Sequence, residues 1–293
     1  MNLLQKFAFN FDARIWRILP GLSEGLLVLE MRDTEKKHAY FVIIRPESGE
    51  ICCDRIEPEQ GWWYGMEAIS GNVLLLHSYE EGQVPAHKAI YAFDARTGKK
   101  LWENLTLRFI CAENNFVWAY DTTGTGETPV LKIELYTGRI ISESSEQEIG
   151  AGHPSFRKLN GVSEFSGTDS SMPMIYNEGG PYFATLAEYI RTKLNGSSPV
   201  QRIEYLESEG HVMISWYSRE LSGAGNENAG TLNNHLLVTD LEGEVELDTT
   251  LGTLLPGVAE TTFFTFGTNL IYPANQGELY CYTLLRKRPA FFA

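Results

Sequence analysis

Two histidines and two glutamates lie close together in one stretch of the chain and could do chemistry. His77 and His87 flank the acidic pair Glu80 and Glu81. Imidazole and carboxylate groups together can bind hard or borderline metal ions. The spacing fixes no further ligand, however, and His77 ends an apolar run, where a hydrogen-bonded histidine is typical. We therefore predict no metal site and no cofactor.

Three consecutive aromatic residues, Trp62, Trp63 and Tyr64, form a second candidate site. If exposed, they would make a patch for a peptide, a sugar or another ring-bearing ligand. The alternative is that one or two of them open a strand and pack in the core. The rest of the predicted binding set lies in or beside the longer connections: Tyr79, Glu80, Glu81, His77, His87, Asp121, Trp216 and Tyr217.

Motifs of known enzyme classes are missing from the sequence. There is no GxSxG nucleophile elbow, and the stretch GTGETP opens no helix that would bind phosphate. DTTGTGET has the composition of a calcium loop without the spacing of an EF-hand. The four cysteines show no CxxC spacing, which argues against a zinc site or a disulfide framework. We assign no catalytic residue.

Charge and composition narrow the classes of partner and compartment. The 293 residues carry 38 acidic and 24 basic side chains, a net charge of −14. This charge repels phosphate, which argues against binding to nucleic acid or to an anionic membrane surface. No apolar stretch reaches the roughly 20 residues needed to cross a bilayer, and the first residues lack a signal-peptide core. We expect a cytoplasmic protein.

The elements that must position these residues are revealed by internal repeats. Four hairpins share an apolar run, a turn that ends in glycine, a charged residue and a second run. They span residues 41–52, 90–101, 130–141 and 236–247.

Each of these four hairpins is preceded by another, with a short polar turn and a strongly apolar second strand, and a fifth hairpin of this kind follows the last of them. These first hairpins span residues 16–32, 64–79, 107–121, 202–218 and 262–275. A unit of four strands in roughly 40–50 residues is typical of a propeller blade. We predict an all-β β-propeller of about five four-stranded blades, with six or seven as the alternative, forming a single domain over residues 1–293.

The last unit runs out of chain after its third strand. Residues 6–11, KFAFNF, alternate with Phe7, Phe9 and Phe11 on one face. We predict that this N-terminal strand supplies the missing fourth strand and closes the ring, because it would remove an open sheet edge.

Residues 144–200 break the pattern. Within them, residues 180–196 predict a helix with Pro181 at its first position and Gly196 after its end. Its apolar stripe is Phe183, Leu186, Ala187, Ile190 and Leu194. The segment is either a helical insertion, which we favour because five first hairpins are clear, or a degenerate sixth blade, which the spacing favours.

The hairpin IYAFDARTGKKLWE, residues 90–103, resembles the repeat of quinoprotein-like (PQQ-type) β-propellers. Blades of that family carry an Ala-x-Asp-x-x-Thr-Gly-Lys-x-x-Trp pattern. The matching residues here are Ala92, Asp94, Thr97, Gly98, Lys99 and Trp102. The other hairpins keep mainly the turn glycine, so the resemblance covers the blade plan over most of the chain. It implies a bacterial member of a group whose members, outside the dehydrogenases, are mostly scaffolds or interaction platforms.

A PQQ-dependent oxidoreductase is the weaker reading of that resemblance. Cys52 and Cys53 match the adjacent bonded cysteines of quinoprotein alcohol dehydrogenases, but those enzymes are exported and longer. Adjacent strand residues also point to opposite faces of a sheet. We therefore predict a non-catalytic binding or scaffold protein for a protein partner or small ligand, acting through the face of long loops opposite the glycine turns. The alternative is an enzyme, a hydrolase or lyase with carboxylates at the axial pocket.

Overall fold

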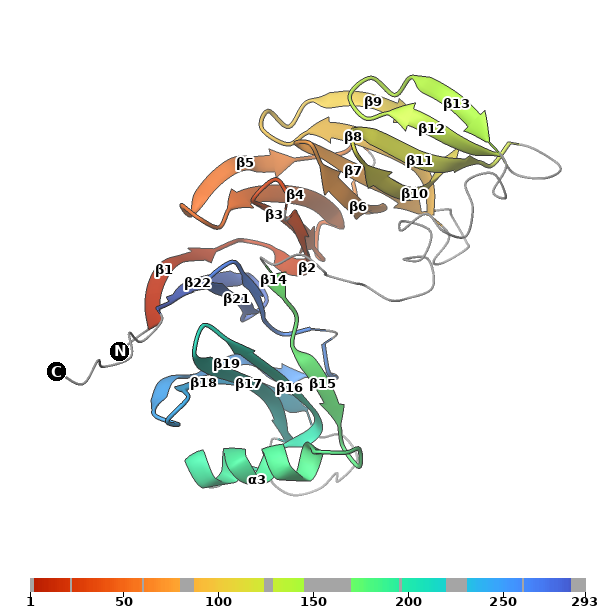
Figure 1. The fold of residues 1–293 in the computed structure, drawn as a ribbon. Coiled ribbons are helices and arrows are strands. Elements are labelled where there is room, and N and C mark those ends of the chain that lie inside the picture. Colours follow the sequence, from red (N-terminus) through yellow and green to blue (C-terminus); the bar gives the residue numbers. More distant parts are fainter. Residues whose placement is uncertain are drawn as a thin grey trace. The chain divides into compact units, whose positions relative to one another are not determined.

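Strands dominate the computed structural model (Figure 1). It describes residues 3–21, 23–59, 61–79, 87–123, 129–144, 170–194, 197–219, 231–259 and 261–285. The chain divides into two compact units. The first unit is Ala13–Ser166, and the second unit combines Met1–Asp12 with Gly167–Ala293. In these described ranges, no helix has the length and apolar composition needed to cross a bilayer.

The first unit contains three antiparallel sheets, each of four strands in chain order. The first sheet comprises β2 (Arg14–Gly21), β3 (Leu26–Asp33), β4 (His38–Arg45) and β5 (Glu50–Ile56). The second comprises β6 (Tyr64–Ser70), β7 (Val73–Tyr79), β8 (His87–Asp94) and β9 (Lys100–Asn104). The third comprises β10 (Leu107–Glu113), β11 (Phe116–Asp121), β12 (Val130–Glu134) and β13 (Ile140–Ser144).

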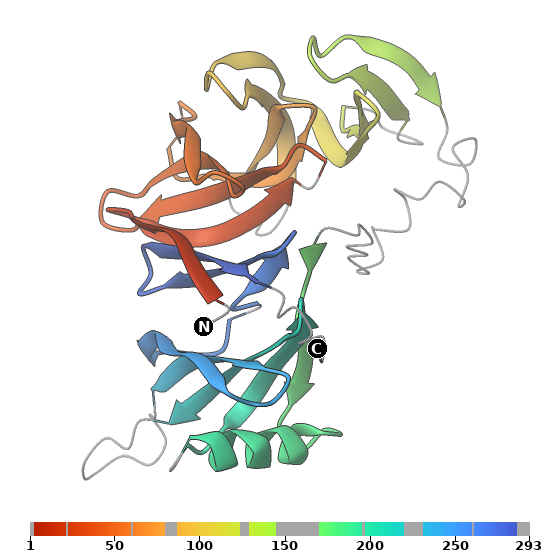
Figure 2. The ribbon, with the colours of Figure 1, turned by 60° about the vertical axis from the view of Figure 1, so that its left-hand side comes forward.

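In its described residues, the second unit contains two antiparallel sheets of five strands and the helix α3 (Phe183–Lys193) (Figure 2). One sheet comprises β15 (Met174–Asn177), β16 (Val200–Ser208), β17 (His211–Arg219), β18 (Leu232–Asp240) and β19 (Val245–Leu255). The other runs in the order β1 (Leu3–Asn10), β22 (Glu278–Leu284), β21 (Asn269–Ala274), β20 (Phe264–Phe266) and β14 (Ser170–Ser171).

Five sheets of this up-and-down plan confirm the predicted fold class, an all-β chain of propeller type with five blade-like sheets in the described residues. The second strands β3 and β7 are buried on both faces, as their apolar sequences predicted, whereas β11 buries only one face, because Phe116 and Trp118 are partly exposed. Leu27, Val28 and Leu29 of β3 and Leu74, Leu75 and Leu76 of β7 have no exposed surface. The side chains of Val28, Leu74, Leu75 and Leu76 fill the layers between adjacent sheets of the first unit.

The hairpin that resembles the quinoprotein repeat is held by its motif residues. Gly98 has a φ of 68°, and Asp94 Oδ1 accepts hydrogen bonds from the backbone N–H and the hydroxyl of Thr97. Trp102 Nε1 donates a hydrogen bond to the carbonyl oxygen of Leu135 in the next sheet, at 2.7 Å. The motif is therefore structural, and it links the second sheet to the third.

The predicted pairing of the N-terminal strand is confirmed. β1 is antiparallel to β22, with Phe7 opposite Cys281 and Phe9 opposite Leu279. The ring of Phe9 contacts those of Phe7 and Phe11, with centroids 4.9 and 5.9 Å apart. The first residues of the chain thus complete the sheet that the last strands begin.

The predicted helix is present, but it begins later than expected. Pro181 lies in the turn before α3, and Tyr182 precedes the first helical residue with a φ of 64°. A left-handed residue at that point turns the chain sharply, so the helix starts at Phe183 rather than at the proline. Gly196 lies outside the described residues.

The apolar stripe of α3 packs on its sheet. Ala187 and Ile190 are buried against Ile203, Ile214 and Trp216 of β16 and β17. The described part of residues 144–200 also supplies β14 and β15, which are edge strands of two separate sheets. These described residues form no four-stranded sheet of their own.

Candidate functional site

A buried arginine fixes the aromatic segment that the sequence singled out. Arg32 on β3 forms an ion pair with Glu30, and the two side chains are 6% and 2% exposed. Its guanidinium also donates hydrogen bonds to the backbone carbonyl oxygens of Trp62 and Tyr64. Because a buried guanidinium needs acceptors for its donors, Arg32 sets the path of the chain between β5 and β6.

The three aromatic side chains of this segment have different surroundings. The Trp62 ring lies over the Arg32 guanidinium at 4.9 Å, a cation–π contact. Tyr64 is 2% exposed and meets Tyr91 edge-on, with ring centroids 5.0 Å apart. Trp63 is 50% exposed. Of the predicted aromatic patch, the Trp63 side chain is therefore the one that presents a large surface to solvent.

His77, Tyr79 and His87 meet beside this segment, around a carboxylate that the sequence did not suggest. The Oε1 atom of Glu67 on β6 lies 2.9 Å from Nδ1 of His77 and 2.9 Å from Nδ1 of His87. The two imidazoles are stacked, with centroids 3.6 Å apart and 9° between their planes. Tyr79 meets both rings edge-on. We call Glu67, His77 and His87 the His–Glu cluster.

Burial and charge act in opposite directions on Glu67. Burial raises the pKa of its carboxyl, but the contacts with His77 and His87 outweigh burial and lower the pKa below its ordinary value. Glu67 is therefore a carboxylate at neutral pH. Burial raises the pKa of the neighbouring Tyr79, and the negative charge of Glu30 adds to this effect.

A cavity of about 290 Å³ opens next to the same segment, along β8 and β9. Its apolar wall consists of the rings of Tyr64, Tyr91 and Phe93. Its charged residues are Glu57 and Glu59, from the connection after β5, and Lys100 and Glu103 of β9. We call this the aromatic–acidic cavity. The remaining lining residues are Pro58, Gly98 and Leu105.

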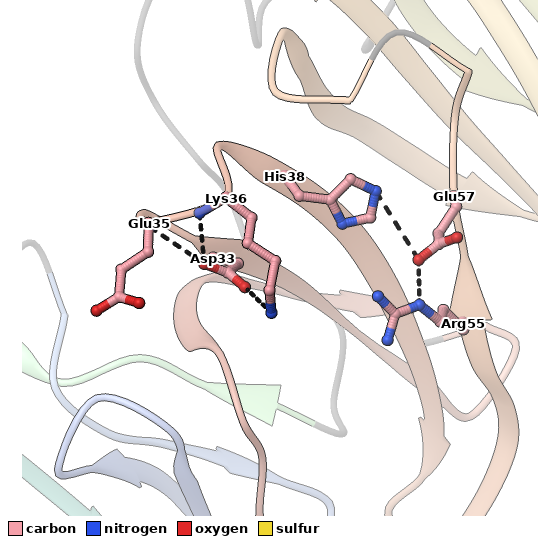
Figure 3. Close-up of polar contacts among 6 residues, drawn as sticks. All are labelled: Asp33, Glu35, Lys36, His38, Arg55 and Glu57. Atoms are coloured by element: carbon pink, nitrogen blue, oxygen red, sulfur yellow. Dashed lines mark hydrogen bonds and ion pairs between the residues drawn. The ribbon is translucent and has the colours of Figure 1, made fainter.

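Two basic side chains hold one wall of this cavity in place (Figure 3). Glu57 Oε1 contacts Nε of Arg55 and lies 3.8 Å from Nε2 of His38. On the neighbouring β3–β4 turn, Asp33 binds Lys36 through both its backbone N–H and its ammonium group. Figure 3 also shows the Glu35 carboxylate directed away from these contacts.

Lys100 is held as a cation. Its ammonium group lies 2.8 Å from Glu103 and 3.5 Å from Glu59. The hydrogen bond with Glu103 is the main cause that raises the pKa of Lys100. The cavity thus combines three carboxylates, one protonated amine and an aromatic wall.

The other predicted binding residues do not extend this site. Glu80 and Glu81 lie outside the described residues. Asp121, at the end of β11, accepts hydrogen bonds from the backbone N–H and hydroxyl of Thr123, which lower its pKa and stabilise its own turn. Trp216 and Tyr217, in the second unit, are 2% and 1% exposed.

The roles of these two buried aromatic residues are visible in their contacts. Trp216 packs in the core under α3. Tyr217 accepts a hydrogen bond from the backbone N–H of Ala259, and burial raises the pKa of Tyr217 to about 12. Both placements give a structural reason for the residue and lend no support to a binding role.

Cys52 and Cys53 form no disulfide bond. Burial raises the pKa of the Cys53 thiol, which makes it a poor nucleophile at neutral pH. The paired-cysteine feature of the quinoprotein alcohol dehydrogenases is therefore not reproduced.

Comparison with known proteins adds a family match over part of the chain. A family model described as a domain of unknown function (DUF4905) matches residues 22–102, which include most of the first two sheets. The search of curated proteins found no match.

Solved structures similar to this chain include BamB, a methanol dehydrogenase and a propeller. BamB from Moraxella catarrhalis is 10% identical, with 96% of this chain and 99% of BamB covered and a TM-score of 0.31. A europium-containing methanol dehydrogenase is 11% identical over 85% of this chain and 53% of its own length, with a TM-score of 0.28. The Dos1 propeller is 8% identical over 92% of this chain and 66% of its own, with a TM-score of 0.27.

Proposed function

We propose that the protein is a non-catalytic binding protein whose aromatic–acidic cavity receives a basic side chain of a protein partner. The observation that carries this proposal is the meeting of three carboxylates with three aromatic rings in one cavity. Cationic groups are attracted both by carboxylates and by the faces of aromatic rings.

The size of the cavity favours a single side chain over a larger ligand. Pockets for drug-sized ligands measure roughly 300–1,000 Å³. The cavity, at about 290 Å³, lies just below that range. A lysine or arginine side chain presented on a partner surface is a suitable occupant, and the half-exposed Trp63 next to Tyr64 offers that partner an apolar contact.

The charge of the aromatic–acidic cavity favours a cationic group as its occupant. Glu59 is 87% exposed and Glu103 is 40% exposed, so both carboxylates are available to a partner. Lys100 is the one basic side chain in the cavity wall, and it leaves an excess of two negative charges among the four charged lining residues. The net charge of −14 on the whole chain acts in the same direction.

The protonation of Lys100 supports binding rather than catalysis. A catalytic lysine needs a lowered pKa to act as a base or a nucleophile. The neighbouring carboxylates raise the pKa of Lys100 instead. It therefore contributes a fixed positive charge that orients Glu59 and Glu103.

A matched pair of variants tests this proposal. The probe is a synthetic nonapeptide of lysine, titrated into the protein by isothermal titration calorimetry beside the same peptide with every lysine acetylated. We expect the double variant Glu59→Gln, Glu103→Gln to bind the unmodified peptide at least 10-fold more weakly, because it removes two cavity carboxylates. The acetylated peptide should not bind measurably.

The control removes the same charge elsewhere in the first unit. Glu35 and Glu143 are exposed and do not line the cavity. The double variant Glu35→Gln, Glu143→Gln should bind as the wild type does. An equal loss in both double variants would show that the peptide responds to overall charge, and the cavity proposal would then be wrong.

A further inference from the structure

We propose that the His–Glu cluster is a binding site for a divalent transition-metal ion of the zinc class, with Glu67, His77 and His87 as its three protein ligands. None of the three residues lines the aromatic–acidic cavity, so this site is separate from the proposed partner site.

The donor set and its spacing suit such an ion. One donor atom from each residue lies within 4.8 Å of the other two. Zinc binds imidazole nitrogen and carboxylate oxygen at about 2.0–2.2 Å, which puts tetrahedral ligand atoms about 3.3 Å apart. The Glu67 oxygen is 2.9 Å from both Nδ1 atoms, so the carboxylate would move by less than about 0.5 Å from each nitrogen to admit the ion.

The ring nitrogens of His77 indicate that this cluster lacks a binding partner. The His77 side chain is 1% exposed, and its Nε2 atom has no hydrogen-bond partner. Its Nδ1 atom lies 2.9 Å from Glu67 Oε1 and also has no hydrogen-bond partner. A buried polar side chain left in this state is costly. A metal ion bound to His77 Nδ1 would give this nitrogen, which forms no hydrogen bond with the carboxylate, a partner.

The backbone brings these residues together through irregular pairing. Glu67 lies at a register shift between Met66 and Ala68 of β6, and His77 lies at another on β7. Bulges of this kind redirect a side chain and occur often beside functional sites. Gly65 is directly opposite His77, and a Cβ there would come within 2.7 Å of the imidazole. The strand therefore leaves room for the His77 ring.

Binding would unstack the two imidazoles. In parallel rings 3.6 Å apart, the Nδ1 lone pairs run side by side and cannot both point at one ion. The His77 ring is enclosed, whereas the His87 side chain is 36% exposed at the start of β8. His87 is thus the ligand that can turn, and its exposed edge is the entry path for the ion.

Three protein ligands leave a fourth position for water or another small donor. Imidazole with carboxylate favours Zn²⁺, Co²⁺, Ni²⁺ or Cu²⁺ over Ca²⁺ and Mg²⁺, which prefer sites made of oxygen atoms alone. Co²⁺ is therefore a suitable spectroscopic probe, because its visible absorption is strong in four-coordinate sites.

The test uses the full chain, stripped of metal with a chelator and titrated with Co²⁺. We expect a visible band that saturates at one equivalent and disappears when Zn²⁺ is added. His87→Ala and Glu67→Gln should each weaken Co²⁺ binding at least 100-fold. A urea unfolding curve of metal-free His87→Ala beside that of the wild type establishes that this variant, which changes a partly exposed residue, is folded.

A second histidine–glutamate pair in the first unit provides the control. His38 and Glu57 lie 3.8 Å apart (Figure 3), and the double variant His38→Ala, Glu57→Gln should bind Co²⁺ as the wild type does. An absent band in the wild type, or an unchanged band in His87→Ala, would overturn the metal site. The His87→Ala variant should bind the lysine peptide as the wild type does. The test of the metal site is therefore independent of the test of the aromatic–acidic cavity.

Discussion

At the scale of single residues, two buried carboxyls show how neighbours decide protonation. Glu67 faces two imidazoles, and its pKa is lowered despite its burial. Glu204 in the second unit has no exposed surface, and its Oε2 atom accepts hydrogen bonds from the backbone N–H and hydroxyl of Thr262. Burial outweighs these bonds and raises the pKa of Glu204. The pKa values of these two buried glutamates are therefore shifted in opposite directions.

The raised pKa of Glu204 predicts a pH-dependent effect of its replacement. A carboxyl whose pKa is higher in the folded state stabilises the fold below its ordinary value of 4.5, and loses that contribution as pH rises through the folded value. Glu204→Gln is neutral at every pH and keeps an acceptor oxygen. We expect it to raise the free energy of unfolding at pH 7 and to give little gain at pH 4, as measured by urea unfolding.

The control for this prediction is the exposed Glu143→Gln, which should leave stability unchanged at both pH values. A gain of equal size at pH 4 and pH 7 for Glu204→Gln would mean that its titration does not contribute.

At the scale of elements, the helix is the part of the second unit best suited to a stability test. Ile190 has no exposed surface and lies between α3 and the sheet. Ile190→Ala should lower the free energy of unfolding by about 2–5 kcal/mol, because it leaves a cavity at that contact. The neighbouring Arg191→Ala, which breaks an exposed ion pair with Glu188, should cost much less. Equal costs in urea unfolding would show that the apolar stripe of α3 does not anchor it.

The elements also show what the sequence could and could not predict. The hairpins were predictable because two buried faces require unbroken apolar strands, as in β3 and β7. The site was only partly predictable. His77, Tyr79 and His87 do meet, but the sequence pointed to Glu80 and Glu81 because they are near in the chain. Glu67 approaches the histidines across a strand pair and at a register shift, and no composition signal marks a bulge.

The cavity was missed for a related reason. Its wall combines the connection after β5 with the outer strands β8 and β9, so its residues are separated by up to 48 positions in the chain, from Glu57 to Leu105. Glu59 and Glu103 appear in the sequence as two of 38 acidic residues. Only the folded arrangement of the strands brings Glu59 and Glu103 into one cavity wall and so distinguishes them from the other acidic residues.

At the scale of the whole molecule, charge predicts the kinetics of partner binding. A net charge of −14 attracts a basic peptide from a distance set by the Debye length, which falls from about 10 Å at 0.1 M salt to about 3 Å at 1 M. Between these salt concentrations, the association rate constant of the lysine nonapeptide should fall by about 10-fold or more. Stopped-flow mixing measures this constant. A salt effect confined to the dissociation rate would contradict long-range attraction.

The repeat also made the larger organisation predictable to the level of five sheets. The glycine turns and apolar runs give each sheet its strands in chain order, and the alternation of Phe7 and Phe9 identified the strand that the last sheet lacks. The edge strands β14 and β15 were not predicted, since two and four residues are too few to show a period.

The pairing of β1 with β22 has a consequence for synthesis. More than 260 residues separate these two strands in the chain, so the ribosome makes Leu3–Asn10 well before Glu278–Leu284. Until β22 is made, β1 has no partner strand, while the three sheets of the first unit already have all the strands described for them. Contacts between residues so far apart in the chain form slowly, so completion of this sheet is a late event in folding. A nascent chain that stalls before Glu278 would leave β1 unpaired, although the stall lies more than 260 residues further along the chain.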